Sequence, residues 1–234
     1  MSTVDFSQLL PPSLITELSY EAIFTKRKES FISLYDASEQ QAVRELLQRE
    51  SEPVVKLLQE NAYLEMLYQA KCNADARSLL LAYAEKSDLD HLALTEYGLT
   101  RLVVTPADNT VIPPVEAVYE SDERLRERCI LSFDGMNTAG SANAYRYFTL
   151  SADGRVDGIK VKSDEATPCF LDIVITQVDS ENGAASEELI QIVQTALDPD
   201  TVRPVGDRPT VKSSIATNYQ IEAVLYVGKN AEDA

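Results

Sequence analysis

The distribution of glycine divides this chain into two parts of different character. The first 97 residues contain no glycine, and all eight glycines lie at or after Gly98. A long stretch without glycine favours helices, whereas glycine and proline punctuate strands and turns. The sequence therefore predicts a helical region over 1–98, a connector over 99–115 and an α+β domain over 116–234.

The longest predicted element is a helix that begins at Pro53 and continues to about residue 84. About 30 residues rising 1.5 Å each would form a rod of about 45 Å. Its apolar stripe is larger than the short helix after it can cover, so we expect an interface with helices of another chain. The residues expected at this helix-bundle interface are Leu57, Leu64 and Leu67. A contact with the helix predicted over 13–35 would bury them equally well.

The second part combines alternating apolar segments with helical ones, which favours a small sheet. Strands are predicted over 158–162, 170–178, about 210–217 and 219–227, and helices over 121–131, from Ser141 onward and over 185–197. The expected fold class is α+β: a helical region with one long helix, then a mixed or antiparallel sheet with helices on one side.

Charge and composition exclude several classes of function. The chain has 21 Lys and Arg against 38 Asp and Glu, a formal net charge of −17, which disfavours nucleic acid as a partner. No apolar run approaches the roughly 20 residues needed to span a bilayer, so no membrane partner is expected. One histidine and three widely spaced cysteines argue against a zinc site.

The segment Asp88-Leu89-Asp90-His91 is the one candidate for catalytic chemistry. Two aspartates at this spacing can bind magnesium or supply a phosphotransfer nucleophile. Such motifs normally follow an apolar strand, whereas the residues before Asp88 are predicted to end a helix. We therefore favour a structural role, in which Ser87 caps a short helix with acids in its first turn and Gly98 ends it. No enzyme activity and no cofactor are expected.

Five phrases spread along the chain carry a resemblance to a known family. Their residues are Leu10, Pro11, Pro12, Glu21, Pro53, Asp88, Leu89, Asp90, Leu92, Ala93, Gly98, Arg101, Gly140, Ser141, Arg203, Pro204, Asp207, Arg208 and Tyr219. In this order they resemble the phage baseplate assembly protein J family, and we call them the signature residues. The resemblance covers residues 9–227. Pro209 departs from it by standing where an apolar strand residue is expected, which would delay that strand. The family also usually continues past this chain's end, so we expect a truncated or short member.

The resemblance implies a structural role in the virion. Members are wedge subunits of the baseplate of a contractile phage tail or tailocin, assembled in the cytoplasm of the host bacterium. They are needed for baseplate assembly and for linking hub, wedge partner and sheath. The implied partners are a second copy of the chain, a wedge partner protein, a lysozyme-like wedge protein, the hub and spike, and the sheath. Two alternatives stay open: a magnesium-dependent phosphotransfer enzyme using Asp88 and Asp90, and a non-viral cytoplasmic adaptor.

Overall fold

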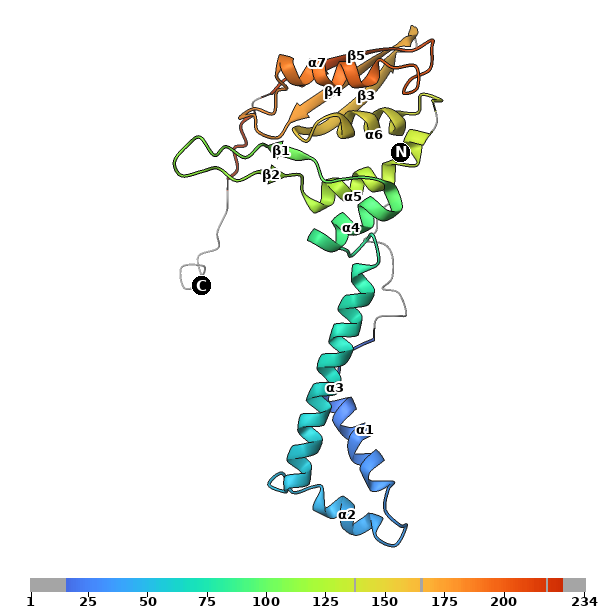
Figure 1. Ribbon diagram of the computed structural model, residues 1–234, viewed down its shortest axis with the longest axis vertical. Coiled ribbons are helices and arrows are strands. Elements are labelled where there is room, and N and C mark those ends of the chain that lie inside the picture. The colour runs from blue at the N-terminus through green and yellow to red at the C-terminus, as the bar shows by residue number, and fades with distance from the viewer. Residues whose placement is uncertain (1–15, 137, 165, 218, 225–234) are drawn as a thin grey trace. The chain divides into compact units, whose positions relative to one another are not determined.

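The helices and strands fall into two units, each with its own contacts. A computed structural model of the chain describes residues 16–136, 138–164, 166–217 and 219–224. The first unit consists of the residues up to Arg101 together with Ser121–Ile130, and the second of Leu102–Glu120 with the residues from Leu131 onward. Figure 1 shows helices in the first and both sheets in the second. The predicted α+β fold class is confirmed.

The described part of the first unit contains five helices, the last of which ends one residue beyond the unit. They are α1 (Tyr20–Ile32), α2 (Gln40–Leu46), α3 (Pro53–Ser78), α4 (Lys86–Tyr97) and α5 (Asp122–Leu131). Ser19 caps α1 by accepting a hydrogen bond from the Ala22 N–H, and α1 lies beside α3 (Figure 1). An apolar cluster of Ile32, Leu47, Val55 and Leu58 joins α1, α2 and α3. A salt bridge of 2.7 Å between Arg27 and Glu65 adds a polar contact between α1 and α3.

The long helix is shorter than predicted. α3 starts at Pro53, as predicted, but ends at Ser78, and the chain then turns before α4 begins. The predicted end near residue 84 was therefore wrong. Arg126 of α5 donates hydrogen bonds to the carbonyls of Leu81 and Ala84, so a distant side chain stabilises this turn.

The start of α4 also differs from the prediction. Its N-cap residue is Glu85, and Lys86 has a positive φ of 50°. Ser87 lies inside the helix and makes no capping hydrogen bond, so the predicted Ser87 cap was wrong. The C-terminal prediction is confirmed: Gly98 ends α4 with φ 66°, a left-handed conformation that costs glycine little.

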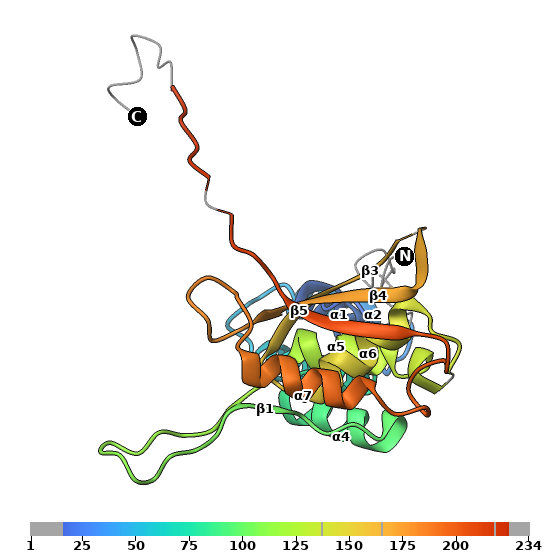
Figure 2. The ribbon, with the colours of Figure 1, turned by 90° about the horizontal axis from the view of Figure 1, so that it is seen from above.

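The second unit contains a three-stranded sheet with two helices against it. The strands are β3 (Val156–Asp164), β4 (Thr167–Gln177) and β5 (Arg208–Ser213), and the helices are α6 (Ala142–Ala152) and α7 (Glu187–Leu197). β3 and β4 pair antiparallel, and β4 and β5 pair parallel, which confirms a mixed sheet with β4 in the centre. Both helices lie on one side of it (Figure 2). Ser141 caps α6, as predicted, and Ser186 caps α7.

The core of this unit lies between the sheet and its helices. Alternate residues of β4, namely Leu171, Ile173 and Ile175, are buried against α6 and α7. The core members from the two helices are Tyr145, Leu150, Leu189, Val193 and Leu197.

Two short strands complete the unit. β1 (Val103–Thr105) and β2 (Val118–Tyr119) form a separate antiparallel pair. A Cβ on Gly154 would collide with the carbonyl oxygen of Val103, so glycine at this position permits a close approach of two backbone segments. β1 is therefore held against the segment between α6 and β3.

The last two predicted strands differ from the structure. β5 begins at Arg208 and includes Pro209, so this proline does not delay the strand. It is tolerated because β5 is an edge strand, where a missing N–H costs no ladder bond. The predicted strand over 219–227 was wrong for residues 219–224, which have no regular structure, and Tyr219 is 83% exposed.

Candidate assembly interface

The signature residues around α4 form a cluster of ion pairs. Arg101 Nε lies 2.6 Å from Asp90 Oδ1, and Arg101 Nη2 lies 2.7 Å from Asp122 Oδ1. The other oxygen of Asp122 accepts a hydrogen bond from the Lys86 N–H at 2.8 Å. Only 15% of the Arg101 side chain is exposed. One guanidinium therefore joins the start of α5 to α4.

The electrostatics of this cluster favour its charged state. Partial burial alone would raise the pKa of Asp122, but hydrogen bonds from Lys86 and Arg101 outweigh it, and the pKa is lowered. Burial likewise opposes the charge of Arg101, yet the bonds to Asp90 and Asp122 raise its pKa overall. The cluster is thus a set of mutually stabilised charges.

The aspartates of the Asp88-Leu89-Asp90 motif do not converge. Asp90 binds Arg101, whereas Asp88 lines a shallow hollow with His91 and Glu96 that Asp90 does not line. Residues two apart on a helix point in different directions. Leu89, which lies between the two aspartates, and Ala93, which follows them, are fully buried. This geometry supports the structural interpretation of the motif. Within the described residues, no three His, Cys, Asp or Glu side chains are grouped to hold a metal ion.

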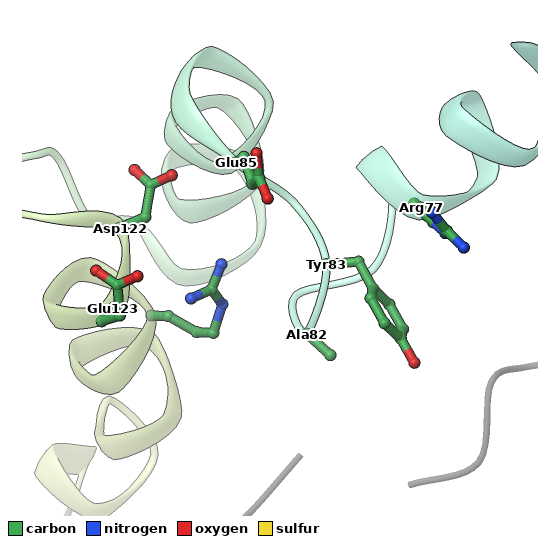
Figure 3. Close-up of a pocket in the computed structure, with 7 residues that line it drawn as sticks. Arg77, Ala82, Tyr83, Glu85, Asp122 and Glu123 are labelled. Carbon is green, nitrogen blue, oxygen red and sulfur yellow. The ribbon is translucent and has the colours of Figure 1, made fainter. Parts of the chain in front are cut away.

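A polar hollow of about 510 Å³ lies beside this cluster. Its lining residues are Arg77, Ala82, Tyr83, Glu85, Asp122, Glu123 and Arg126. Figure 3 shows Asp122 and Glu123 projecting from α5, with Arg77 and Tyr83 on the opposite wall. Charges of both signs line it, and the Arg126 guanidinium already binds two main-chain carbonyls. The hollow is therefore explained by the contacts that stabilise the turn after α3.

A second cluster brings together signature residues that are about 60 positions apart. Tyr145 donates a hydrogen bond from its hydroxyl to Asp207 Oδ2 at 2.7 Å. Burial raises the pKa of the Tyr145 hydroxyl well above its usual value, and the hydrogen bond to the Asp207 carboxylate raises this pKa further. A Cβ on Gly140 would lie 2.8 Å from Asp207 Oδ2 and 2.8 Å from Pro204 Cγ. Arg203 binds the carbonyl of Asp207 at 3.0 Å. The cluster joins the start of α6 to the loop before β5.

The other signature residues are spread over the chain. Pro53 is the first residue of α3, and Glu21 lies in the first turn of α1, where the helix dipole favours an acid. Arg208 opens β5 and donates to the Val205 carbonyl. Leu92 lines the Asp88 hollow. Leu10, Pro11 and Pro12 lie outside the described residues.

An exposed apolar row runs along α3. Leu57 is 57% exposed, Leu64 54% and Leu67 46%, and Tyr63 and Tyr68 are also exposed. The opposite side of α3 carries the buried residues Val55, Leu58, Ala62 and Asn73. α1 packs against that buried side. The intramolecular alternative for the three leucines, burial by the segment 13–35, is thus not what the structure shows; residues 13–15 lie outside its described part.

Two structural residues were not predicted from the sequence. Asn73 is 8% exposed and exchanges hydrogen bonds with both the N–H and the carbonyl of Thr16, so it fixes the chain before α1 to α3. Its signal was a polar residue on the apolar side of the helix. Arg126 gave no comparable signal, because its partners are main-chain carbonyls more than 40 residues away.

Comparisons with known proteins agree with the signature. The baseplate J-like N-terminal domain matches residues 50–108, and the baseplate J-like central domain matches residues 137–213. Baseplate protein J of Escherichia phage P2 is 45% identical over 227 residues, covering 97% of this chain and 74% of that protein. The chain belongs to the baseplate J-like family. It is a structural protein of the phage baseplate.

The two matched domains of this baseplate J-like chain contain most of the two clusters. Asp90 and Arg101 lie in the matched N-terminal domain, and Gly140, Tyr145 and Asp207 lie in the central one. Asp122 falls between the matched ranges and still binds Arg101. In the described part of the chain, no helix combines the length and apolarity that crossing a membrane requires.

Proposed function

We propose that this baseplate J-like chain is a wedge subunit of a contractile tail, and that α3 contributes to a helical bundle with other chains. In this role it links a wedge partner, the hub and spike, and the sheath, with a second copy of itself in the same wedge. The observation that carries the proposal is the exposed apolar row of α3. The signature clusters have the supporting role of fixing α4 to α5 and α6 to β5.

The spacing of the row suits a partner helix. Leu57, Leu64 and Tyr68 follow one another at intervals of seven and four, and Tyr63 and Leu67 lie alongside. These intervals place side chains on one stripe of a helix, as in helical bundles. α3 has 26 residues and so extends about 39 Å. Its row therefore offers a long, narrow apolar surface.

Among the described residues of the first unit, none covers the row. α1 occupies the opposite side of α3, where Leu58 and Val55 are buried. Leaving several large apolar side chains exposed along one line favours an interface. Burying one leucine contributes about 2 kcal/mol, so three would contribute substantially to binding.

The test places a charge in the row. Leu64→Glu and Leu67→Glu, expressed together with the other baseplate proteins, should abolish co-purification of the wedge because a buried, unpaired carboxylate is costly. Both side chains are exposed in the isolated chain, so circular dichroism should show unchanged folding. The matched control is Leu94→Glu on α4, because Leu94 is 54% exposed, as Leu64 is.

A phage assay adds a functional measurement. Plasmid-borne variants are supplied to cells infected with a phage that lacks this gene, and infectious particles are counted. The Leu64→Glu and Leu67→Glu variants should fail to restore the titre, whereas Leu94→Glu should restore it. Normal co-purification and titre of both row variants would contradict the bundle role of α3.

A further inference from the structure

In the described part of the chain, α6 and α7 cover one face of the three-stranded sheet, and no helix covers the other (Figure 2). The register places Lys160, Val174 and Lys212 in one row across it, and Lys162, Asp172 and Thr210 in the next. These residues alternate with the buried ones that face α6 and α7. Phe170 and Arg208 form a further pair on the same face. We call this set the open sheet face.

The open sheet face is basic although the chain is strongly acidic. Seven Lys and Arg residues lie between residues 131 and 224, and four of them are on this face: Lys160, Lys162, Arg208 and Lys212. Asp172 also lies on this face and pairs with Lys212 at 2.6 Å. Lys160 and Lys162 are exposed and form no salt bridge with any described residue. The face therefore has an excess of positive charge.

The opposite side of the same unit is acidic. Residues 181–200, which include α7, contain five acids and no Lys or Arg. α7 packs on the sheet through Leu189, Val193 and Leu197. The acids of this segment, which include Glu188, Asp198 and Asp200, are exposed. Glu188 lies 3.2 Å from Arg155 and Asp200 lies 3.9 Å from Arg203, whereas Glu181, Glu187 and Asp198 form no ion pair with a described residue. We call residues 181–200 the acidic helical segment.

We propose that the open sheet face of one copy of this chain docks against the acidic helical segment of a second copy. The two surfaces have opposite charge and lie on opposite sides of one unit. Such a contact is head-to-tail, with different surfaces on the two partners. Phe170, which is 60% exposed, and Val174 supply apolar area beside the lysines. This contact uses no residue of α3 and does not depend on the proposed bundle.

Complementary charge is the argument for a second copy as the occupant. Two copies that each carry a formal net charge of −17 repel each other at long range, so the contact depends on local pairing between the lysines of the open sheet face and the acids of the acidic helical segment. Attraction between the surfaces is screened by salt, since the Debye length falls from about 10 Å at 0.1 M to about 3 Å at 1 M. Self-association that weakens with salt is therefore expected.

The experiment uses complementary charge reversals in the full chain. Sedimentation equilibrium measures the association of the wild type, of Lys160→Glu/Lys162→Glu, and of Asp198→Lys/Asp200→Lys. Lysines at the end of α7 suit the helix dipole, so this second variant should stay folded. The matched control for the lysine reversal is Lys56→Glu/Lys71→Glu. It changes the net charge of the chain by the same amount, at two exposed positions of α3.

The expected results are specific. The wild type and the α3 control associate at low salt and dissociate at high salt, whereas each reversal variant alone associates at least about tenfold more weakly. A mixture of the two reversal variants regains association, because their charges are again opposite. A monomeric wild type at low salt, or no recovery in the mixture, overturns the proposal. So does binding of a DNA duplex that is lost in Lys160→Glu/Lys162→Glu, since the face would then be a phosphate site.

Discussion

Gly140 is the residue of the second signature cluster that tolerates a side chain least. Its φ is 74°, and an added Cβ would lie 2.8 Å from both Asp207 and Pro204. Gly183 has φ 70° but nothing within 4 Å of such a Cβ. Both alanine variants incur the left-handed backbone cost of about 1–2 kcal/mol. We predict that Gly140→Ala loses at least about 1 kcal/mol more than Gly183→Ala through overpacking. Urea unfolding measures the difference, and equal losses would contradict the close contact.

Asp122 makes the stability of the α4–α5 contact depend on pH. Its pKa in the folded chain is lowered, so its stabilising contribution is present above the unfolded value of about 3.9 and is lost as pH falls through the folded value. We predict that Asp122→Asn lowers the melting temperature at pH 7, and that the difference from wild type shrinks as pH falls from about 5 to 3. The control is Asp75→Asn, an exposed surface pair with Lys71, which should change little. A difference that stays constant over this range would contradict the assigned role of Asp122.

At this scale the sequence identified residues but not their partners. Asp90, Arg101, Gly140 and Asp207 were all singled out by resemblance, yet nothing local predicts that Arg101 binds Asp122 or that Tyr145 binds Asp207. Such pairings are fixed by how helices pack, and side-chain spacing along the chain carries no record of them.

Individual elements were predicted well where a local signal existed. Pro53, Gly98 and Ser141 mark helix ends by their own backbone or side-chain chemistry, and each stands where predicted. The end of α3 at Ser78 has no such marker. Arg126 hydrogen-bonds the carbonyls of the turn from another helix, so tertiary contact ended a segment that propensity would have continued.

The segment 219–224 is the clearest case in which an alternating pattern did not produce a strand. Tyr219, Ile221 and Val224 are each at least 77% exposed. Alternation predicts a strand only where another strand supplies hydrogen bonds. We predict that the amides of residues 219–224 exchange rapidly with solvent hydrogen. The amides of Ile173 and Ile175 in β4 should exchange slowly, with an opening free energy close to that of global unfolding. Native-state hydrogen exchange measures both. Slow exchange at 219–224 would mean that this segment pairs in solution.

At the scale of the whole molecule, glycine content predicted a helical region over 1–98 and an α+β domain over 116–234. It did not give the division between the two compact units, because α5 lies beyond the predicted connector while residues 121–130 belong to the first unit. Leu125 and Cys129 of α5 are fully buried, and Arg128 donates to the Thr100 carbonyl. A chain that returns to an earlier unit leaves no compositional signal.

The last prediction concerns which fragment retains the fold of the second unit. The sequence predicted an independent domain over 116–234, whereas the compact unit also includes β1. β1 pairs with β2, and the Leu102 N–H donates to Glu120 Oε1 at 2.9 Å. We therefore expect a fragment over 102–234 to unfold cooperatively at a higher urea concentration than one over 116–234. Both fragments contain α5 without its partners in the first unit, so their difference isolates the contribution of residues 102–115. Equal midpoints would show that β1 adds nothing to the stability of the sheet, and would favour the boundary at residue 116.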